Sequence, residues 1–281
     1  MSELGLGLIA AFAWGFHDIC VRYVSQKTPL MATLLAVLCA GLVFHLAVML
    51  GAGEFHPLPP KAAALAALSG VFFLVASLGL YGAFQRGPVR LVAPIIASYP
   101  ILSVLWAASM GAQVSVWQWL AVLVILGGVT AVAALSGRTE DHAPPEGLTI
   151  AYAAAAAVGF AGTFAFSQMA AEMSHHLPVT LVTRSTAIML LVAGMLACRL
   201  PFWPGRGALG MLALMGLADG VALLCMVSTG GMPDAQYAAV AASIFGLLTI
   251  VLAWALLGER MTRPQWLGCA TAFAGIGYLA V

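Results

Sequence analysis

Long apolar runs alternate with short polar segments along the whole chain. A helix that crosses the hydrocarbon core of a bilayer needs about 20 mainly apolar residues, and prolines collect between the runs, where helices end. The pattern predicts an all-α membrane protein with ten transmembrane helices. These predicted helices, one to ten, are Leu4–Val24, Leu30–Gly51, Lys61–Gln85, Leu91–Met110, Val116–Leu135, Leu148–Ala171, Pro178–Arg199, Ala208–Thr229, Ala235–Leu257 and Pro264–Val281.

The two halves of the chain carry similar motifs in the same order. We expect a first five-helix repeat over residues 1–137, a linker over residues 138–147 and a second repeat over residues 148–281. Because five is odd, the second half must lie upside down, as in the inverted repeats of many secondary transporters. The first half has Gly87-Pro88-Val89, Ala97-Ser98, Trp106 and Gln118-Trp119-Leu120, and the second has Met232-Pro233-Asp234, Ala242-Ser243, Trp254 and Gln265-Trp266-Leu267.

Composition supports this interpretation and excludes other classes. Hydrophobic residues make up 63% of the chain and charged residues 7%, whereas a soluble domain has about 25% charged residues. The formal net charge of +1 leaves no basic face, so we exclude nucleic acid as a partner. The five cysteines lack a metal-binding spacing, and nothing in the sequence calls for a metal or another cofactor.

The positive charges predict an orientation in the membrane. Lys61 and Arg184 lie on the side where the chain begins, and the other Lys and Arg residues lie on the opposite side. Because cytoplasmic loops carry an excess of Lys and Arg, we expect both termini outside. The residues on the cytoplasmic side would be Arg22, Lys27, Arg86, Arg90, Arg138, Arg199, Arg206, Arg260 and Arg263.

Asp18 lies inside the first apolar run. A carboxylate at membrane depth is costly and usually faces a cavity, a partner or a proton path. Trp14, Asp18 and Arg22 follow one another at spacings of four, so they share a helical face, and His17 borders it. One interpretation is an aromatic wall beside a carboxylate that binds a proton or a cation. The alternative is that Arg22 neutralises Asp18 one turn away.

Asp219 lies in the middle of the eighth predicted helix, between Gly216 and Gly220. The GxxxG spacing lets another helix approach closely. No basic residue lies within one turn of Asp219, so its partner must come from another helix, a water or the substrate. Burial without a counter-charge favours the neutral form of a carboxyl group. Asp219 is therefore the better candidate for a group that titrates during proton coupling, and Asp18 for a contact backed by an aromatic ring.

Helices three, four and seven contribute further candidates. Ser77 and Tyr81 lie one turn apart on helix three and predict a polar stripe that faces the interior. Pro94 and Pro100 flank Tyr99 in helix four, which predicts a broken helix, because proline frees backbone carbonyls. The counterpart, helix nine, has Gly246 instead. Arg184 near the start of helix seven either reaches the membrane surface or contacts a substrate carboxylate.

Four short motifs together resemble the EamA-type drug/metabolite transporter superfamily: Ala13-Trp14-Gly15, the proline-bearing helix after Gly87-Pro88, Val182-Thr183-Arg184 and Gly258-Glu259-Arg260. The chain departs from that pattern at Gly111-Ala112-Gln113, where the family's Gly-Glu-Arg would lie. The resemblance implies export, or sometimes uptake, of small metabolites. Many members of the superfamily are drawn with cytoplasmic termini, in contrast to the charge count.

These patterns predict a multi-pass secondary transporter of the bacterial inner membrane, not an enzyme. It would carry an amine or amino acid by alternating access, with proton coupling or exchange, as a monomer or homodimer. The cavity is expected between helices one, three, four, six, eight and nine. The rivals are a cationic drug or quaternary-amine carrier, a membrane-embedded lipid-modifying enzyme and a passive channel. The expected substrate-binding residues are Trp14, His17, Asp18, Ser77, Tyr81, Tyr99, Arg184 and Asp219.

Overall fold

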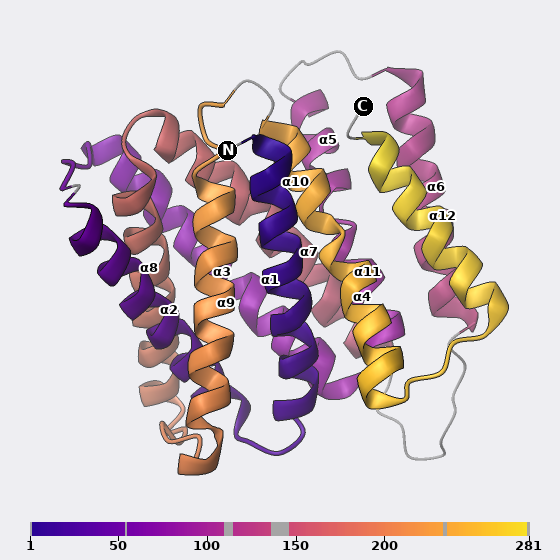
Figure 1. Cartoon of the computed structure of the whole chain (residues 1–281), viewed down its shortest axis with the longest axis horizontal. Coiled ribbons are helices and arrows are strands. Elements are labelled where there is room, and N and C mark those ends of the chain that lie inside the picture. Colours follow the sequence, from indigo (N-terminus) through magenta and orange to yellow (C-terminus); the bar gives the residue numbers. More distant parts are fainter. Residues whose placement is uncertain (1, 54, 110–114, 136–145, 233–234, 280–281) are drawn as a thin grey trace.

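The computed structural model describes residues 2–53, 55–109, 115–135, 146–232 and 235–279. The described residues form helices and connecting turns without a strand, which confirms the all-α fold class (Figure 1). Seven stretches are long and apolar enough to cross a membrane, and shorter apolar helices accompany them. The seven are Glu3–Val24, Leu30–Ala52, Pro60–Arg86, Glu146–Glu172, His176–Ala197, Arg206–Val227 and Ala238–Leu257.

The helices follow the apolar runs closely, with two runs divided. Predicted helix four is divided into α4 and α5, and predicted helix nine into α10, α11 and a π-helical turn, η2. The helices of the first half are α1 (Glu3–Val24), α2 (Leu30–Ala52), α3 (Pro60–Arg86), α4 (Val89–Ala97), α5 (Pro100–Ser109) and α6 (Val116–Leu135). Those of the second half are α7 (Glu146–Glu172), α8 (His176–Ala197), η1 (Arg206–Ala208), α9 (Leu209–Val227), α10 (Ala235–Ser243), α11 (Phe245–Leu252), η2 (Ala253–Leu257) and α12 (Arg263–Leu279).

The core lies between helices from the two halves of the chain. Helix α1 packs against α9, α10 and α11, α2 against α9, and α3 against α7 and α8. Helices α6 and α12 pack on each other at one side of the molecule (Figure 1). Small residues permit these contacts: a Cβ atom on Gly216 of α9 would lie 2.5 Å from the carbonyl oxygen of Val37 on α2. The predicted close approach at the GxxxG motif is therefore present, with α2 as the neighbour.

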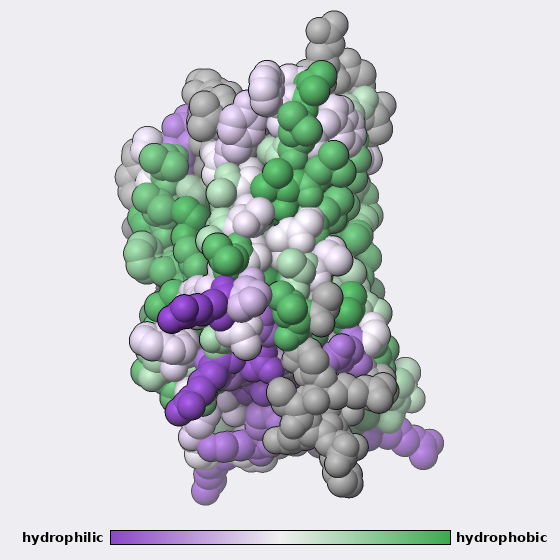
Figure 2. Space-filling model, turned by 90° about the vertical axis from the view of Figure 1, so that its right-hand side faces the viewer, coloured by the Kyte–Doolittle hydropathy of each residue, from purple (hydrophilic) through white to green (hydrophobic). Residues whose placement is uncertain are grey.

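The face of the molecule drawn in Figure 2 divides into an apolar band and a polar end. Figure 2 shows hydrophobic residues over most of the visible height and hydrophilic residues gathered at the lower end. Helix α1 finishes at this lower end, and α12 finishes at the opposite end, where α1 begins (Figure 1). The polar end is thus the one to which the sequence assigns most Lys and Arg residues.

Both divided helices break at the same repeated motif. Ser98 and Ser243, from the Ala-Ser pairs of the two halves, each donate a side-chain hydrogen bond of 2.7 Å to a carbonyl oxygen three residues earlier. Gly246 of α11 packs on Ala97 of α4. The two breaks therefore lie close together. The break after Ser98 was predicted from its flanking prolines. The break after Ser243 was not, because no proline marks it.

Candidate functional site

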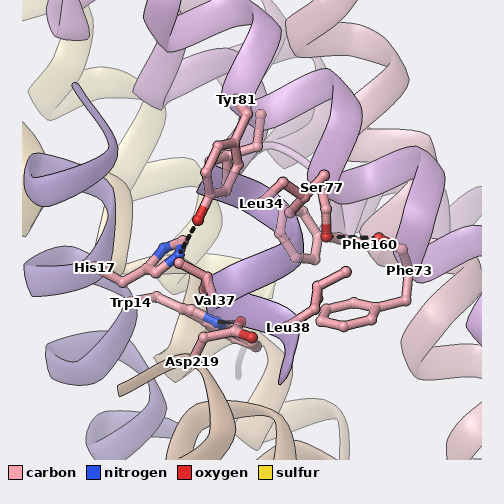
Figure 3. Close-up of a pocket in the computed structure, with 11 residues that line it drawn as sticks. Trp14, His17, Leu34, Val37, Leu38, Phe73, Ser77, Tyr81, Phe160 and Asp219 are labelled. Carbon is pink, nitrogen blue, oxygen red and sulfur yellow. Dashed lines mark hydrogen bonds between the residues drawn. The ribbon is translucent and has the colours of Figure 1, made fainter. Parts of the chain in front are cut away.

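A small cavity lies among the helices where the halves meet (Figure 3). Its side chains come from α1, α2 and α3 of the first half and from α7 and α9 of the second. The space open to the centre of a water-sized sphere is about 10 Å³, which suffices for about one water molecule. The lining residues are Trp14, His17, Leu34, Val37, Leu38, Phe73, Ser77, Leu80, Tyr81, Phe160 and Asp219.

Asp219 is held by two partners from other helices. Its Oδ2 accepts a hydrogen bond of 2.8 Å from Arg184 Nη2 on α8. Its Oδ1 accepts one of 3.1 Å from the indole Nε1 of Trp14 on α1, and Figure 3 shows the indole nitrogen directed at the carboxylate. The partner expected from another helix is therefore Arg184. The assignment of Asp219 as the titrating group rested on burial without a counter-charge, and Arg184 supplies that counter-charge.

Arg184 is fully buried behind Asp219 rather than exposed in the cavity. Its guanidinium lies 5.2 Å from the centre of the Phe73 ring. The Nη1 side fits against Gly41 of α2, where a Cβ atom would overlap the guanidinium. Arg184 therefore does not reach the membrane surface, and it is not open to a substrate carboxylate. Arg184 instead neutralises Asp219 in the core.

Asp18 belongs to a second hydrogen-bonded group. Its Oδ1 lies 3.0 Å from Nδ1 of His17, and Nε2 of His17 lies 3.2 Å from the Tyr81 hydroxyl. The His17–Tyr81 contact crosses from α1 to α3 beside the cavity (Figure 3). Asp18 is fully buried, and its Oδ2 has no hydrogen-bond partner. His17 thus stands between the cavity and the Asp18 carboxylate.

Arg22 does not neutralise Asp18. Its Nε lies 3.4 Å from Oε1 of Glu259, and its Nη1 donates to the carbonyl oxygen of Phe84. Arg22 is near the end of α1, so its long side chain reaches the polar end of the molecule. Glu259 Oε2 also accepts a hydrogen bond of 2.9 Å from the backbone N–H of Val89, at the start of α4. The alternative in which Arg22 pairs with Asp18 is therefore wrong.

Five of the eight predicted site residues line the cavity: Trp14, His17, Ser77, Tyr81 and Asp219. Asp18 and Arg184 lie directly behind lining residues, as their hydrogen bonds to His17 and Asp219 require. Tyr99 lies one layer further away, with its ring 5.3 Å from that of Phe164 and its hydroxyl donating 2.6 Å to the carbonyl oxygen of Ala239. Tyr99 therefore joins the two broken helices instead of lining the cavity.

The sequence did not reveal the contribution of helix α2. Leu34, Val37 and Leu38 form one wall of the cavity, although the cavity was expected without the second helix. These residues lie in an otherwise apolar run, in which Thr33 and His45 are the buried polar positions. Phe160 of α7 was also missed. Among the described residues, no group of three or more His, Cys, Asp or Glu side chains is placed to hold a metal ion.

The seven long apolar helices are typical of a multi-pass membrane protein. The model of the EamA-like transporter family matches this chain twice, over residues 1–134 and residues 147–281. The chain belongs to the EamA-like transporter family, and the resemblance seen in its motifs is confirmed. Family and fold together support a transporter of the drug/metabolite type.

Comparison with solved structures supports the fold, while no curated protein matches the sequence. One similar crystal structure, described only as that of a protein, superimposes with a TM-score of 0.71 at 16% sequence identity. The match covers 99% of this chain and 96% of the other. At that identity, the likeness concerns the fold alone.

Proposed function

We propose that the chain is a secondary active transporter that moves a small amine or amino acid across the bacterial inner membrane. The observation that carries this proposal is the buried cavity between the two halves, where Asp219, His17 and Tyr81 meet aromatic walls. Ionisable side chains at membrane depth mark substrate and ion pathways. Cations are also attracted to the faces of aromatic rings, so an amine-bearing solute suits this lining.

Transport would proceed by alternating access between two inverted five-helix halves, with ten membrane-spanning helices and residues 138–147 as the linker. Each half matches the same family model, and each has a broken helix at its Ala-Ser motif. The cavity has room for about one water, so a metabolite enters only when helices part. The crossing of α4 and α11 at Gly246 is a natural place for that movement.

The site residues in this proposal are Trp14, His17, Ser77, Tyr81 and Asp219 around the solute, with Asp18 and Arg184 acting through their partners. Protons or a second solute supply the driving force. Both termini lie outside, as the charge count favours. The protein works as a monomer or a homodimer.

A second candidate is a carrier of cationic drugs or quaternary amines. It is favoured by the Arg184–Asp219 ion pair, because an arginine already engaged with a carboxylate offers little to a substrate carboxylate. Flux in liposomes distinguishes the two: transport of quaternary amines without amino-acid flux favours the cation carrier. A lipid-modifying enzyme has less support, since its chemistry needs a group of catalytic side chains at a membrane face.

The test is transport by the purified full-length protein in liposomes with an imposed pH gradient. Labelled amines and amino acids are supplied one at a time, and protein-free liposomes are the control. Accumulation above equilibrium, abolished by a protonophore, is the expected result. Equilibration without accumulation indicates a channel, and no flux of any of these solutes contradicts the proposed function.

A further inference from the structure

The buried charges in the core do not balance. Among the described residues, the buried charged side chains are Asp18, Asp219 and Arg184, with the histidines His17 and His45 beside them. Two carboxylates and one guanidinium leave one negative charge in excess when both histidines are neutral. Burial of an uncompensated charge is costly. The core therefore requires one further positive charge, which either a proton or a bound cation supplies.

His17 is placed to take this proton. Its Nδ1 faces the Asp18 carboxylate at 3.0 Å and its Nε2 faces the Tyr81 hydroxyl at 3.2 Å. A hydroxyl group both donates and accepts, whereas a protonated imidazole donates from both nitrogens. Both contacts therefore persist when His17 gains a proton. His17 also lines the cavity, so its charge acts directly on whatever the cavity holds.

The charged and titratable groups around the His17–Asp18 pair come from three helices. Helix α3 contributes Tyr81, α9 contributes Asp219, and α1 itself contributes Cys20. Helices α10 and α11, which also pack on α1, contain no acidic or basic residue. On α2, the other buried histidine, His45, has its Nε2 2.8 Å from the carbonyl oxygen of Gly220 and is not among the residues that line the cavity.

We propose that one proton on the His17–Asp18 pair and one substrate cation in the cavity replace each other. This rests on the proposed function and makes the transporter a one-for-one exchanger of a proton and a monovalent cation. When the cation enters, beside Asp219 and the Trp14 ring, the proton leaves His17 for water, and the total charge of the core does not change. Asp219 stays ionised throughout, because Arg184 holds it.

The same charge balance selects the chemical class of the substrate. A singly charged amine compensates the excess negative charge completely. A zwitterionic amino acid carries both an ammonium and a carboxylate and has no net charge. Its binding therefore leaves the excess negative charge of the core uncompensated. Arg184 does not compensate that carboxylate, since it is paired with Asp219 at 2.8 Å and buried behind the cavity wall. The substrate class is thus an apolar monoamine rather than the amino acid that carries the same side chain.

The experiment measures proton release when three matched probes bind to the purified full-length protein. The probes are phenethylamine, phenylalanine and 2-phenylethanol, which share a ring and differ in charge. Calorimetry in buffers of different ionisation enthalpy counts the protons. Phenethylamine should bind most tightly and, at acid pH, release about one proton per molecule bound, with Kd rising about tenfold for each unit of falling pH.

Two variants and a control locate the proton. Asp18→Asn removes the excess charge, so it should weaken phenethylamine binding at least about tenfold at neutral pH and abolish proton release; a loss of about tenfold equals 1.4 kcal/mol. His17→Gln should also remove the proton release, because the imidazole that carries the proton is gone. Glu3→Gln, on the same helix but outside the core, makes the same change of charge as Asp18→Asn and should change neither quantity.

The inference is overturned if the unaltered protein binds phenethylamine without releasing a proton at any pH tested. It is also overturned if Asp18→Asn binds phenethylamine and releases a proton as the unaltered protein does. Tighter binding of phenylalanine than of phenethylamine overturns it as well, while the proposed amine or amino-acid transport stands. If no amine or amino acid binds and none is transported in liposomes, the proposed function itself fails.

Discussion

Arg184 Nη2 lies 2.8 Å from Asp219 Oδ2, in a contact that joins α8 to α9 inside the core. Arg184 is fully buried, and its Nε and Nη1 have no hydrogen-bond partner. Removal of one member of a buried ion pair leaves an uncompensated charge, which costs more than the pair itself contributes. The two residues should therefore behave as a unit.

Asp219→Asn and Arg184→Gln should each lower the free energy of unfolding by about 3–5 kcal/mol. The double variant should lose less than the sum of the two, because it removes both members of the ion pair together. Denaturant unfolding in detergent, analysed as a double-mutant cycle, measures the coupling. Additive losses would contradict the pairing.

Trp14→Phe should weaken the site while preserving its aromatic wall. The change removes the indole N–H that donates 3.1 Å to Asp219 Oδ1. A hydrogen bond to a charged group contributes about 1.5–3 kcal/mol, so a loss of that order in the free energy of unfolding is expected. Trp203→Phe, at an exposed position, is the control. Equal effects of the two changes would mean that the indole N–H contributes nothing.

Glu259→Gln should loosen the polar end of the molecule. Glu259 pairs with Arg22 of α1 and accepts from the first backbone N–H of α4, where a negative charge also interacts favourably with the helix dipole. The expected loss is about 1 kcal/mol in the free energy of unfolding. Glu172→Gln at an exposed helix end serves for comparison, and its stability should not decrease.

Gly246→Ala should disturb the crossing of the two broken helices. A Cβ atom at this position would lie 2.6 Å from Cβ of Ala97 and 3.0 Å from the carbonyl oxygen of Ala93. Overpacking of a close contact costs about 1–3 kcal/mol, and both flux in liposomes and thermal stability should fall. Gly277 of α12 has no heavy atom within 4 Å of such a Cβ, so Gly277→Ala should leave both unchanged.

The fold class and the helix ranges followed from the sequence because the bilayer imposes a simple rule on it. A spanning helix must be apolar over most of its length, so composition and length alone located α1, α2 and α3 to within a few residues. Pro94 and Pro100 marked the break in helix four, since proline disrupts the backbone hydrogen bonds of a helix. The equivalent break after Ser243 carries no such residue, so it emerged only from the packing of α11 on α4.

The sequence by itself determined which residues are costly to bury: Asp18, Asp219, Trp14 and Arg184 stood out as polar or charged groups in apolar runs. Tertiary structure decided how they pair. Arg184 is 35 residues from Asp219, and Trp14 is 205 residues from it, so no local spacing could reveal either contact. Arg22 is the basic residue nearest to Asp18 in the same helix, but it pairs with Glu259 instead. Charge compensation depends on distance in space, and only the packing of the helices sets that distance.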